Sequence, residues 1–306
     1  MPEGFSFAEL LETFESVHLP TIASGTRRRY LVDLDFRIKP YFQKREDVRE
    51  ITSLDLHRFR ASILKKISRK SVNNCTDLLG LIFRKAVEWE MLEKSPKNFK
   101  RLKLAETKYL WWDKRESIVT FLEHAKMSRY YPAYKLALEC GLRIGEIVGL
   151  GKSDVNLERC QIHIHQQWLE REKELAPTKN WCQRFLNFDK QSDLRETLAE
   201  SIAKSPHPQA IFVDETGDRV HPKQLRVNDY NTWLESSLVP RIRFHDLRHT
   251  FASWYMLEHD NIWNLKKILG HKDIQTTQRY AHLSKKHQVV ESLNWSSFEN
   301  QVGGDP

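Results

Sequence analysis

Two basic side chains in the segment FHDLRHT, residues 244–250, have the types and the spacing to act on one phosphate group. His245 and Arg248 are three residues apart, so on a helix they would face the same side. A guanidinium can bind two phosphate oxygens as a fork, and an imidazole can hold or move a proton near neutral pH. The apolar run FASWYML that follows would anchor this helix to a core. The alternative interpretation is a surface ion pair with Asp246.

A second arginine occurs in the segment GLRIGE, residues 141–146. Gly141 can turn the backbone sharply after the helical segment LALECG, and this turn would point Arg143 inward. Glu146 could then orient the guanidinium of Arg143. Phosphoryl transfer needs such a second cation, because negative charge grows on the nonbridging oxygens in the transition state.

The segment LGHKDIQTTQRYAH, residues 269–282, places His271 a few helical turns ahead of Tyr280. A tyrosine hydroxyl, with an ordinary pKa of about 10, is a poor nucleophile near neutral pH. It needs a group that takes its proton and cations that compensate its charge, which the arginines and histidines above can supply. The alternatives are a helix-cap or core histidine at position 271 and a buried core tyrosine at position 280.

Taken together and in this order, GLRIGE, HDLRHT and LGHKDIQTTQRYAH resemble the tyrosine recombinases, the family of phage integrases and of recombinases that resolve chromosome dimers. The resemblance covers nearly the whole chain. Its motifs are highly specific as a set, because each is long, ordered and near-complete. It implies a site-specific DNA recombinase, most plausibly one that integrates or excises a mobile element or prophage.

The resemblance implies a role for each matching residue. Arg143 and Arg248 take the places of the paired arginines that clamp the scissile phosphate. His245 takes the place of the histidine that works in proton transfer or phosphate contact, and His271 matches the second histidine of the site. Tyr280 matches the nucleophile.

Lys179, in the segment APTKN, resembles the lysine at the turn of the family's β-hairpin, with Arg184 following at the expected distance. Its implied role is that of a general acid, which gives a proton to the departing 5′ oxygen while Tyr280 forms a 3′-phosphotyrosine.

The phosphotyrosine keeps the bond energy, so rejoining needs no ATP. No paired carboxylates for a two-metal site lie near these residues, and we expect neither a metal nor a cofactor. The alternative for Lys179 is an ordinary surface lysine.

Length and charge fit this interpretation. A chain of 306 residues is long enough for about two domains. Its formal net charge of +8 favours a polyanionic partner, expected to be double-stranded DNA at attachment or core sites. The cysteines form no CxxC pair, and no apolar run reaches the length of a membrane span. We therefore expect a cytoplasmic protein, acting at the nucleoid, with no membrane partner.

The organisation predicted from the pattern of apolar residues is α+β and multidomain. The resemblance implies that residues 1–106 form an all-helical, SAM-like core-binding domain, and the pattern predicts its helices in FAELLETF, LDLHRFRASIL and TDLLGLIFRKAVEWEML. Thr52 or Ser53 could cap the second of these. The polar stretch 97–108 is expected to be an extended interdomain linker. We expect the bundle to begin at once, without room for a separate arm-site domain, the alternatives being a naturally short integrase and a truncated sequence.

Residues 107–306 are expected to form a mostly helical catalytic domain with a small antiparallel sheet. Asp113 and Glu116 have capping-box spacing ahead of the first helix. Alternation in CQIHIHQQW and CQRFLNF predicts the strands. The tail after Tyr280 can form an apolar helical face from Val289, Val290 and Leu293. In the family that the chain resembles, such a tail docks on a neighbouring subunit, which implies a cyclically linked homotetramer on DNA; the alternative is packing within its own subunit.

Two other functions share some of these features. A type IB topoisomerase has the same tyrosine and basic chemistry but acts as a monomer on supercoiled DNA. A DNA-binding regulator could keep the fold and lose the activity, although the complete residue set argues against this. For a recombinase, an accessory DNA-bending or excision factor is a further expected partner.

Overall fold

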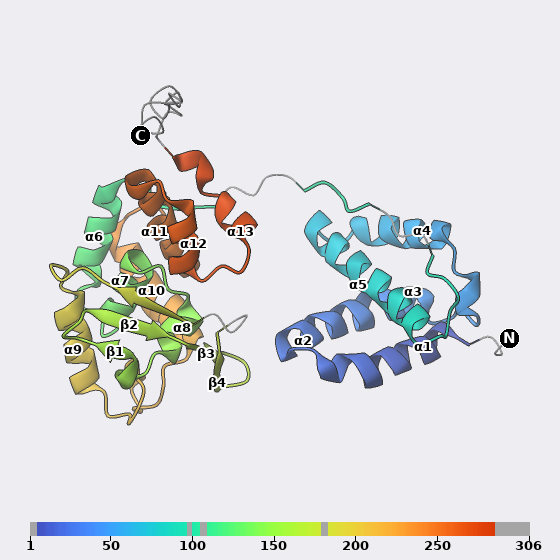
Figure 1. The fold of residues 1–306 in the computed structure, drawn as a ribbon, viewed down its shortest axis with the longest axis horizontal. Helices are drawn as coiled ribbons and strands as arrows, with labels where there is room; N and C mark the ends of the chain where they lie inside the picture. The colour runs from blue at the N-terminus through green and yellow to red at the C-terminus, as the bar shows by residue number, and fades with distance from the viewer. Residues whose placement is uncertain (1–4, 97–99, 105–108, 179–182, 285–306) are drawn as a thin grey trace, which may run out of the picture. The chain divides into compact units, whose positions relative to one another are not determined.

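A computed structural model describes residues 5–96, 100–104, 109–178 and 183–284 of the chain. The chain forms two compact units, residues 1–107 and 108–306 (Figure 1). Each unit has its own hydrophobic core. None of the helices in the described ranges combines the length and the apolar character needed to cross a bilayer.

The regular elements in the described part of the first unit are all helices. Its elements are α1 (Phe7–Thr13), η1 (Phe14–His18), η2 (Leu19–Thr21), α2 (Ser24–Asp33), η3 (Leu34–Ile38), α3 (Lys39–Phe42), η4 (Val48–Glu50), α4 (Ser53–Leu64) and α5 (Arg69–Glu88). The three predicted helical segments correspond to α1, α4 and α5. Thr52 caps α4 as predicted, through a capping box in which the backbone of Asp55 donates to the Thr52 hydroxyl and the Asp55 carboxylate accepts from the Thr52 backbone.

Aromatic rings fill the core of this first unit. Phe7 packs on Phe42 and Phe83 with ring centroids 5.1 Å and 6.2 Å apart, and Phe42 packs on Phe59 at 5.1 Å. These rings come from α1, α3, α4 and α5, so they join helices that are far apart in the sequence. Burial of aromatic side chains on this scale is a main source of stability in a small helical unit.

Residues 100–104, the described part of the predicted linker before position 105, have no regular secondary structure. They are nevertheless fastened to the helices. The Asn73 side chain donates to the carbonyl of Leu102 at 2.9 Å and accepts from its N–H at 2.8 Å. Arg60 donates to the carbonyl of Lys100 at 3.0 Å. This part of the predicted linker is therefore attached to α4 and α5 rather than free.

The second unit is mostly helical with two small antiparallel sheets, which confirms the predicted fold class. Its elements are α6 (Arg115–Ala125), α7 (Tyr131–Glu139), α8 (Ile144–Gly149), η5 (Lys152–Asp154), β1 (Val155–Asn156), β2 (Gln161–Ile164), β3 (Gln166–Leu169), β4 (Glu174–Pro177), β5 (Arg184–Asn187), α9 (Leu194–Lys204), η7 (Gln224–Asp229), α10 (Tyr230–Ser237), α11 (Phe244–His259), α12 (Ile262–Leu269), α13 (Ile274–Gln278) and η8 (Ala281–Leu283).

The strands form a three-stranded sheet in the order β1-β2-β5 and a separate hairpin of β3 and β4. Alternation along β2 buries Ile162 and Ile164, and the antiparallel register places Ile162 opposite Leu186 and Ile164 opposite Arg184. This register places Arg184, the first residue of β5, beside the last residue of β2, at one end of the strands. The predicted sheet is therefore confirmed but is divided in two.

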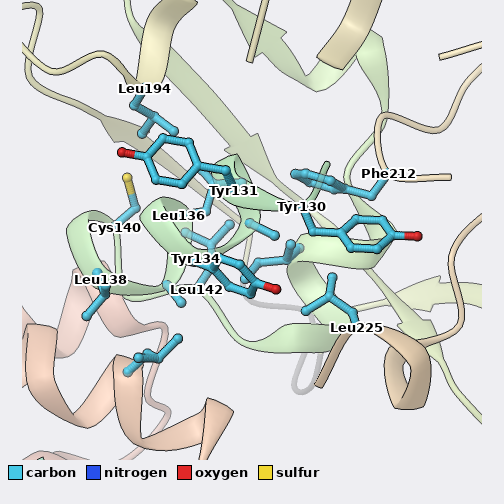
Figure 2. Close-up of a cluster of buried hydrophobic side chains, with 14 of the residues drawn as sticks. Tyr130, Tyr131, Tyr134, Leu136, Leu138, Cys140, Leu142, Leu194, Phe212 and Leu225 are labelled. Carbon is cyan, nitrogen blue, oxygen red and sulfur yellow. The ribbon is translucent and has the colours of Figure 1, made fainter. Parts of the chain in front are cut away.

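The core of the second unit surrounds α7, whose side chains are buried on nearly every face (Figure 2). Tyr134 lies within it, with its ring 5.4 Å from that of Phe121. The predicted capping box of Asp113 and Glu116 is wrong. The helix α6 begins at Arg115 with Lys114 as its N-cap, and no side chain caps it. The predicted tail helix, from position 285 onward, lies outside the described residues.

Candidate active site

The helix α11 contains the HDLRHT segment. In its first turn Asp246 is bound by another residue and is therefore not a partner for the site. Asp246 is buried and accepts from the backbone N–H of Arg243 at 2.8 Å and from its guanidinium at 2.8 Å. The Asp246 carboxylate is thus paired with Arg243, which precedes the helix. The alternative interpretation, an ion pair of His245 or Arg248 with Asp246, is wrong, and Arg248 is left to other partners.

Arg248 points from α11 between the ends of two other helices. Its guanidinium donates to the carbonyl of Gly141, after α7, at 2.5 Å and to the carbonyl of Leu269, at the end of α12, at 2.6 Å. Its Nη2 also lies 3.1 Å from Nε2 of His271. Burial, followed by the charge of Arg143, lowers the pKa of Arg248 to about 9, so it remains a cation at neutral pH.

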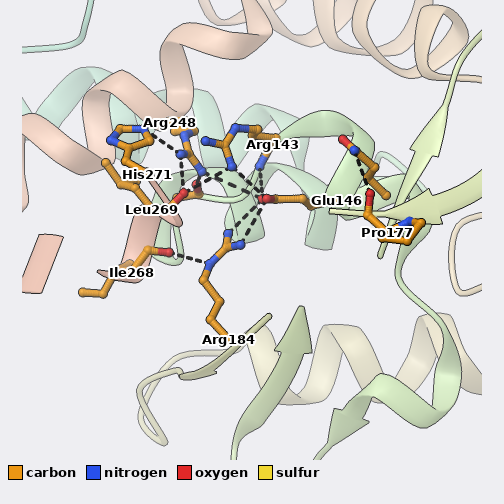
Figure 3. A network of polar contacts seen from close by, with 10 residues as sticks. Arg143, Glu146, Pro177, Arg184, Arg248, Ile268, Leu269 and His271 are labelled. Atoms are coloured by element: carbon orange, nitrogen blue, oxygen red, sulfur yellow. Dashed lines mark hydrogen bonds and ion pairs between the residues drawn. The ribbon is translucent and has the colours of Figure 1, made fainter. Parts of the chain in front are cut away.

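Glu146 is the anion around which the arginines gather (Figure 3). It accepts from Arg143 at 2.9 Å and from both terminal nitrogens of Arg184 at 3.1 Å and 2.9 Å. Arg248 lies 3.9 Å away. Burial alone would raise the pKa of Glu146, but the guanidiniums, Arg184 foremost, lower it to about 2. Three guanidiniums against one carboxylate leave an excess of two positive charges at this point.

Gly141 allows this arrangement, as predicted. Its φ of +65° lies in the left-handed region, and a Cβ at this position would lie 2.5 Å from Cδ1 of Phe251. Arg143 follows this turn directly. The backbone N–H of Arg143 donates to Glu146 at 2.9 Å, and its guanidinium also donates to the Leu269 carbonyl at 3.2 Å. The predicted orientation of Arg143 by Glu146 is confirmed.

His271 follows Gly270, which ends α12 with a φ of +61°. Its Nε2 faces Arg248, and its Nδ1 lies 3.0 Å from the Thr277 hydroxyl. Burial, followed by the charge of Arg248, lowers the pKa of His271 to about 3, so the ring is neutral at pH 7. Arg143, Arg248 and His271 are therefore brought together, and their arrangement suits an anion whose charge increases during a reaction.

Tyr280 is 1% exposed and packs in a small apolar cluster with residues of α11 and α12. Its burial agrees with the alternative of a core tyrosine. Its hydroxyl, however, lies 2.5 Å from Nδ1 of His249. The ring of Tyr109 covers both, at 5.2 Å from the Tyr280 ring and 5.0 Å from the His249 ring. His249 is a functional candidate that the sequence reasoning did not select, although it lies beside Arg248 in the quoted motif.

The remaining predicted residues are placed differently. His245 lies on the exposed side of the first turn of α11, and its ring meets that of His249 edge to face at 5.1 Å. Lys179 lies outside the described residues, between β4 and β5. Arg184 was considered in the sequence only for its spacing from Lys179, and no role was assigned to it. In the structure it belongs to the cluster around Glu146. It also donates to the carbonyl of Ile268 at 2.7 Å and so joins β5 to α12.

Among the described residues, one group could offer three ligand atoms to a metal ion, and it does not belong to this cluster. Asp154, His163 and His165 have ligand atoms within 4.8 Å of one another. The Asp154 carboxylate is already engaged, since it lies 2.9 Å from Nε2 of His165 and accepts from the N–H of Gly151 at 2.8 Å. Asp154 and His165 thus form a hydrogen-bonded pair between η5 and the residue after β2, and the His163 ring stacks on that of His165 at 4.7 Å.

The neutral histidines predict a loss of stability in mild acid. The pKa values of His249 and His271 fall from 6.5 to about 4 and about 3 in the folded chain, chiefly through burial. The unfolded chain therefore takes up protons that the folded chain does not. Their stabilising contribution is complete above pH 6.5 and is lost as the pH falls toward 4. Between pH 7 and pH 5 we expect the free energy of unfolding to fall by on the order of 2–4 kcal/mol.

Urea unfolding of the whole chain at pH 7 and pH 5 measures this loss. The matched control is a chain with His249→Asn and His271→Asn, in which neither position can titrate. The difference in unfolding free energy between the two pH values should be much smaller in this variant. An equal difference in both proteins would show that other groups cause the loss.

Comparisons with known proteins agree with this geometry. The model of the phage integrase family matches residues 108–287. The ICEBs1 integrase of Bacillus subtilis (strain 168) is 26% identical over 303 residues, covering 92% of this chain and 82% of the relative. The tyrosine recombinase XerA of Saccharolobus solfataricus is 27% identical over 264 residues, covering 82% of each chain.

Solved structures are similar over almost the whole chain. A Tn1549 transposon integrase in complex with transposon right end DNA has a TM-score of 0.74 at 18% identity, covering 96% of this chain and 98% of the other. A lambda integrase tetramer bound to a Holliday junction has a TM-score of 0.72 at 14% identity, covering 95% and 81%. At these identities the likeness concerns the fold.

Proposed function

The chain belongs to the phage integrase family and is a site-specific DNA recombinase, and from this premise we propose that Tyr280 is its nucleophile. The observation that carries the assignment is the convergence of Arg143, Arg248 and His271 beside the carbonyl of Leu269. Burial raises the pKa of the Tyr280 hydroxyl, and the charge of Arg248 opposes this rise.

The proposed reaction is a displacement at phosphorus. The Tyr280 oxygen attacks a phosphodiester, a 3′-phosphotyrosine forms, and the 5′ oxygen leaves with a proton that we assign to Lys179. The nonbridging oxygens gain charge as the new bond forms, and Arg143 and Arg248 supply the excess positive charge that stabilises it. Attack of a 5′ hydroxyl on the phosphotyrosine reverses these steps and rejoins DNA.

The buried Tyr280 must become accessible before this reaction. At 1% exposure its hydroxyl cannot touch a phosphate, and Tyr109 is among the residues that cover it. Tyr109 is the first described residue after position 108 and is itself only partly buried. We therefore assign the opening to a displacement of Tyr109, which leaves Tyr280 beside the arginines.

The two units would divide the work. We propose that residues 1–106 contact DNA as a core-binding domain and that residues 107–306 cut and rejoin it. The lambda integrase structure is a tetramer on a Holliday junction, which supports a homotetramer on DNA for this chain also. The ICEBs1 and Tn1549 integrases support attachment sites of a mobile element as substrate, and an accessory factor remains part of the proposal. Genomic DNA as substrate favours action in the cytoplasm, at the nucleoid.

Trapping of covalent adducts tests the proposal. Wild-type protein is incubated with pooled nicked duplexes from the source genome, quenched with SDS, and the attached DNA is sequenced while the linked peptide is identified by mass spectrometry. Adducts on Tyr280 that cluster at one inverted-repeat site support a site-specific recombinase. Adducts spread over many sequences indicate a topoisomerase, and retained DNA binding without adducts indicates an inactive binding protein.

The same experiment tests the expected independence of metal ions. Because the arginines supply the positive charge, excess EDTA should leave the yield of adducts unchanged within about twofold, whereas a metal-dependent nuclease would lose its activity. The control is a restriction enzyme treated with the same EDTA on the same duplexes. Loss of adducts that returns on addition of Mg²⁺ would contradict the proposed charge compensation.

A further inference from the structure

The proton of the nucleophile needs an acceptor, and the residue assigned by resemblance is not the one in contact. His245 makes no hydrogen bond to Tyr280 among the described residues, and its ring meets the His249 ring edge to face at 5.1 Å. His249, one helical turn along α11 and directly after Arg248, has its Nδ1 2.5 Å from the Tyr280 hydroxyl. It is also 7% exposed and therefore protected from water.

We propose that His249 is a catalytic residue that accepts the proton of Tyr280 as the tyrosine attacks phosphorus. The inference rests on the proposed nucleophile. In this step the Tyr280 O–H bond breaks, its proton moves to Nδ1 of His249, and the O–P bond forms while the bond from phosphorus to the 5′ oxygen breaks. Reversal returns the proton to Tyr280 when DNA is rejoined, so no other reactant is consumed.

The protonation state of the ring suits this role. Burial, followed by the charge of His245, lowers the pKa of His249 to about 4, so the ring is neutral at pH 7 and one of its nitrogens is free to accept. In the tautomer of neutral His249 that carries its hydrogen on Nε2, Nδ1 accepts from the Tyr280 hydroxyl, and this is the tautomer that the proposed step requires.

The charged groups around His249 explain how the substrate would strengthen it as a base. Arg248 on its own helix and Arg279 beside Tyr280 also lower its pKa, whereas Asp246 raises it. A phosphodiester bound by the arginines adds a negative charge that opposes them and brings the pKa of His249 closer to neutrality. The acceptor thus improves when a phosphate is in place, which favours proton transfer in the reacting complex over the free protein.

Two substitutions separate proton transfer from positioning. His249→Asn keeps a hydrogen-bond acceptor near the position of Nδ1 but cannot take a proton, and His249→Ala leaves a space that free imidazole can enter. We expect both to slow adduct formation by about 100-fold or more, with DNA binding retained. Imidazole should restore His249→Ala and should not affect His249→Asn. The low-pH limb of the rate profile that depends on His249 should disappear in His249→Asn.

A substrate with a sulfur in place of the bridging 5′ oxygen sharpens the test. A thiolate leaves without a proton, because a thiol pKa is about 8.5, so this substrate relieves a missing general acid but not a missing base. The His249 variants should stay slow on it, whereas Lys179→Ala should recover. His249→Asn at the wild-type rate, or His249→Ala without rescue by imidazole, overturns the role of His249. Failure of the nucleophile assignment is distinct, since wild-type protein would then form no adduct on Tyr280.

Discussion

Tyr280→Phe is expected to abolish covalent adducts on nicked duplexes, lowering their rate of formation by at least about 10⁴-fold, while the protein still binds DNA. The phenylalanine ring fills the same space in the cluster of α11 and α12, and only the hydroxyl and its hydrogen bond to His249 are lost. The free energy of unfolding should therefore change by no more than about 1–2 kcal/mol. Adducts are measured after SDS quenching, and unfolding is measured in urea.

The matched control is Tyr230→Phe. Tyr230 is also 1% exposed, and its hydroxyl donates to the carbonyl of Ile242 at 3.1 Å, so the substitution removes a buried hydroxyl from the same domain. It should lower stability by a similar amount and leave adducts unchanged. If Tyr280→Phe still formed adducts at the wild-type rate, another residue would be the nucleophile and the proposed site would be wrong.

Glu146→Gln should be the most destabilising of the conservative substitutions in the site. The amide has the shape of the carboxylate but no charge, so the guanidiniums of Arg143, Arg184 and Arg248 lose their common anion. Removing one partner of a buried ion pair typically costs about 3–5 kcal/mol, because the remaining charge is left uncompensated. We expect a loss of this size in unfolding free energy and at least a tenfold loss of adducts.

Two further proteins make this test specific. Glu258→Gln breaks the ion pair with Arg115, whose side chains are 45% and 67% exposed, and should cost less than about 1 kcal/mol. Adding Arg184→Met to Glu146→Gln removes one of the uncompensated cations. The double variant should therefore lose less unfolding free energy than the sum of the losses in the two single variants. Additive losses would show that Glu146 and Arg184 act independently.

The parts of this protein that could be predicted from sequence are those set by neighbouring residues. The turn at Gly141, the contact of Glu146 with Arg143 and the cap at Thr52 each involve residues a few positions apart. Where two local solutions compete, spacing alone is insufficient. Asp113 and Glu116 fit a capping box, yet the helix begins later, at Arg115.

Contacts that join distant elements could not be predicted in this way. Arg184 reaches Glu146 only because the register of β2 and β5 brings the start of β5 beside α8 and α12, and nothing around residue 184 in the sequence encodes that register. His249 was within a quoted motif, but its contact with Tyr280 depends on how the chain after α13 packs on α11. The α2 helix was not singled out because its sequence, SGTRRRYLVD, is largely polar and has no clear apolar face.

The two carbonyl groups that hold Arg248 bear on how this chain could change over generations. Arg248 fastens the end of α7 to the end of α12 through Gly141 and Leu269, so its loss should weaken the fold as well as the proposed catalysis. A lysine carries a single ammonium in place of the planar fork and cannot reproduce both bonds in this geometry. The hydroxyl of Tyr280, by contrast, can be lost at little cost in folding. In a descendant that binds DNA without cutting it, we therefore expect Tyr280 to be replaced first, while selection for folding still preserves Arg248. In such a lineage, retention of the arginine at position 248 would indicate only that the protein still folds. Retention of the tyrosine at position 280 would indicate that the proposed activity is still under selection.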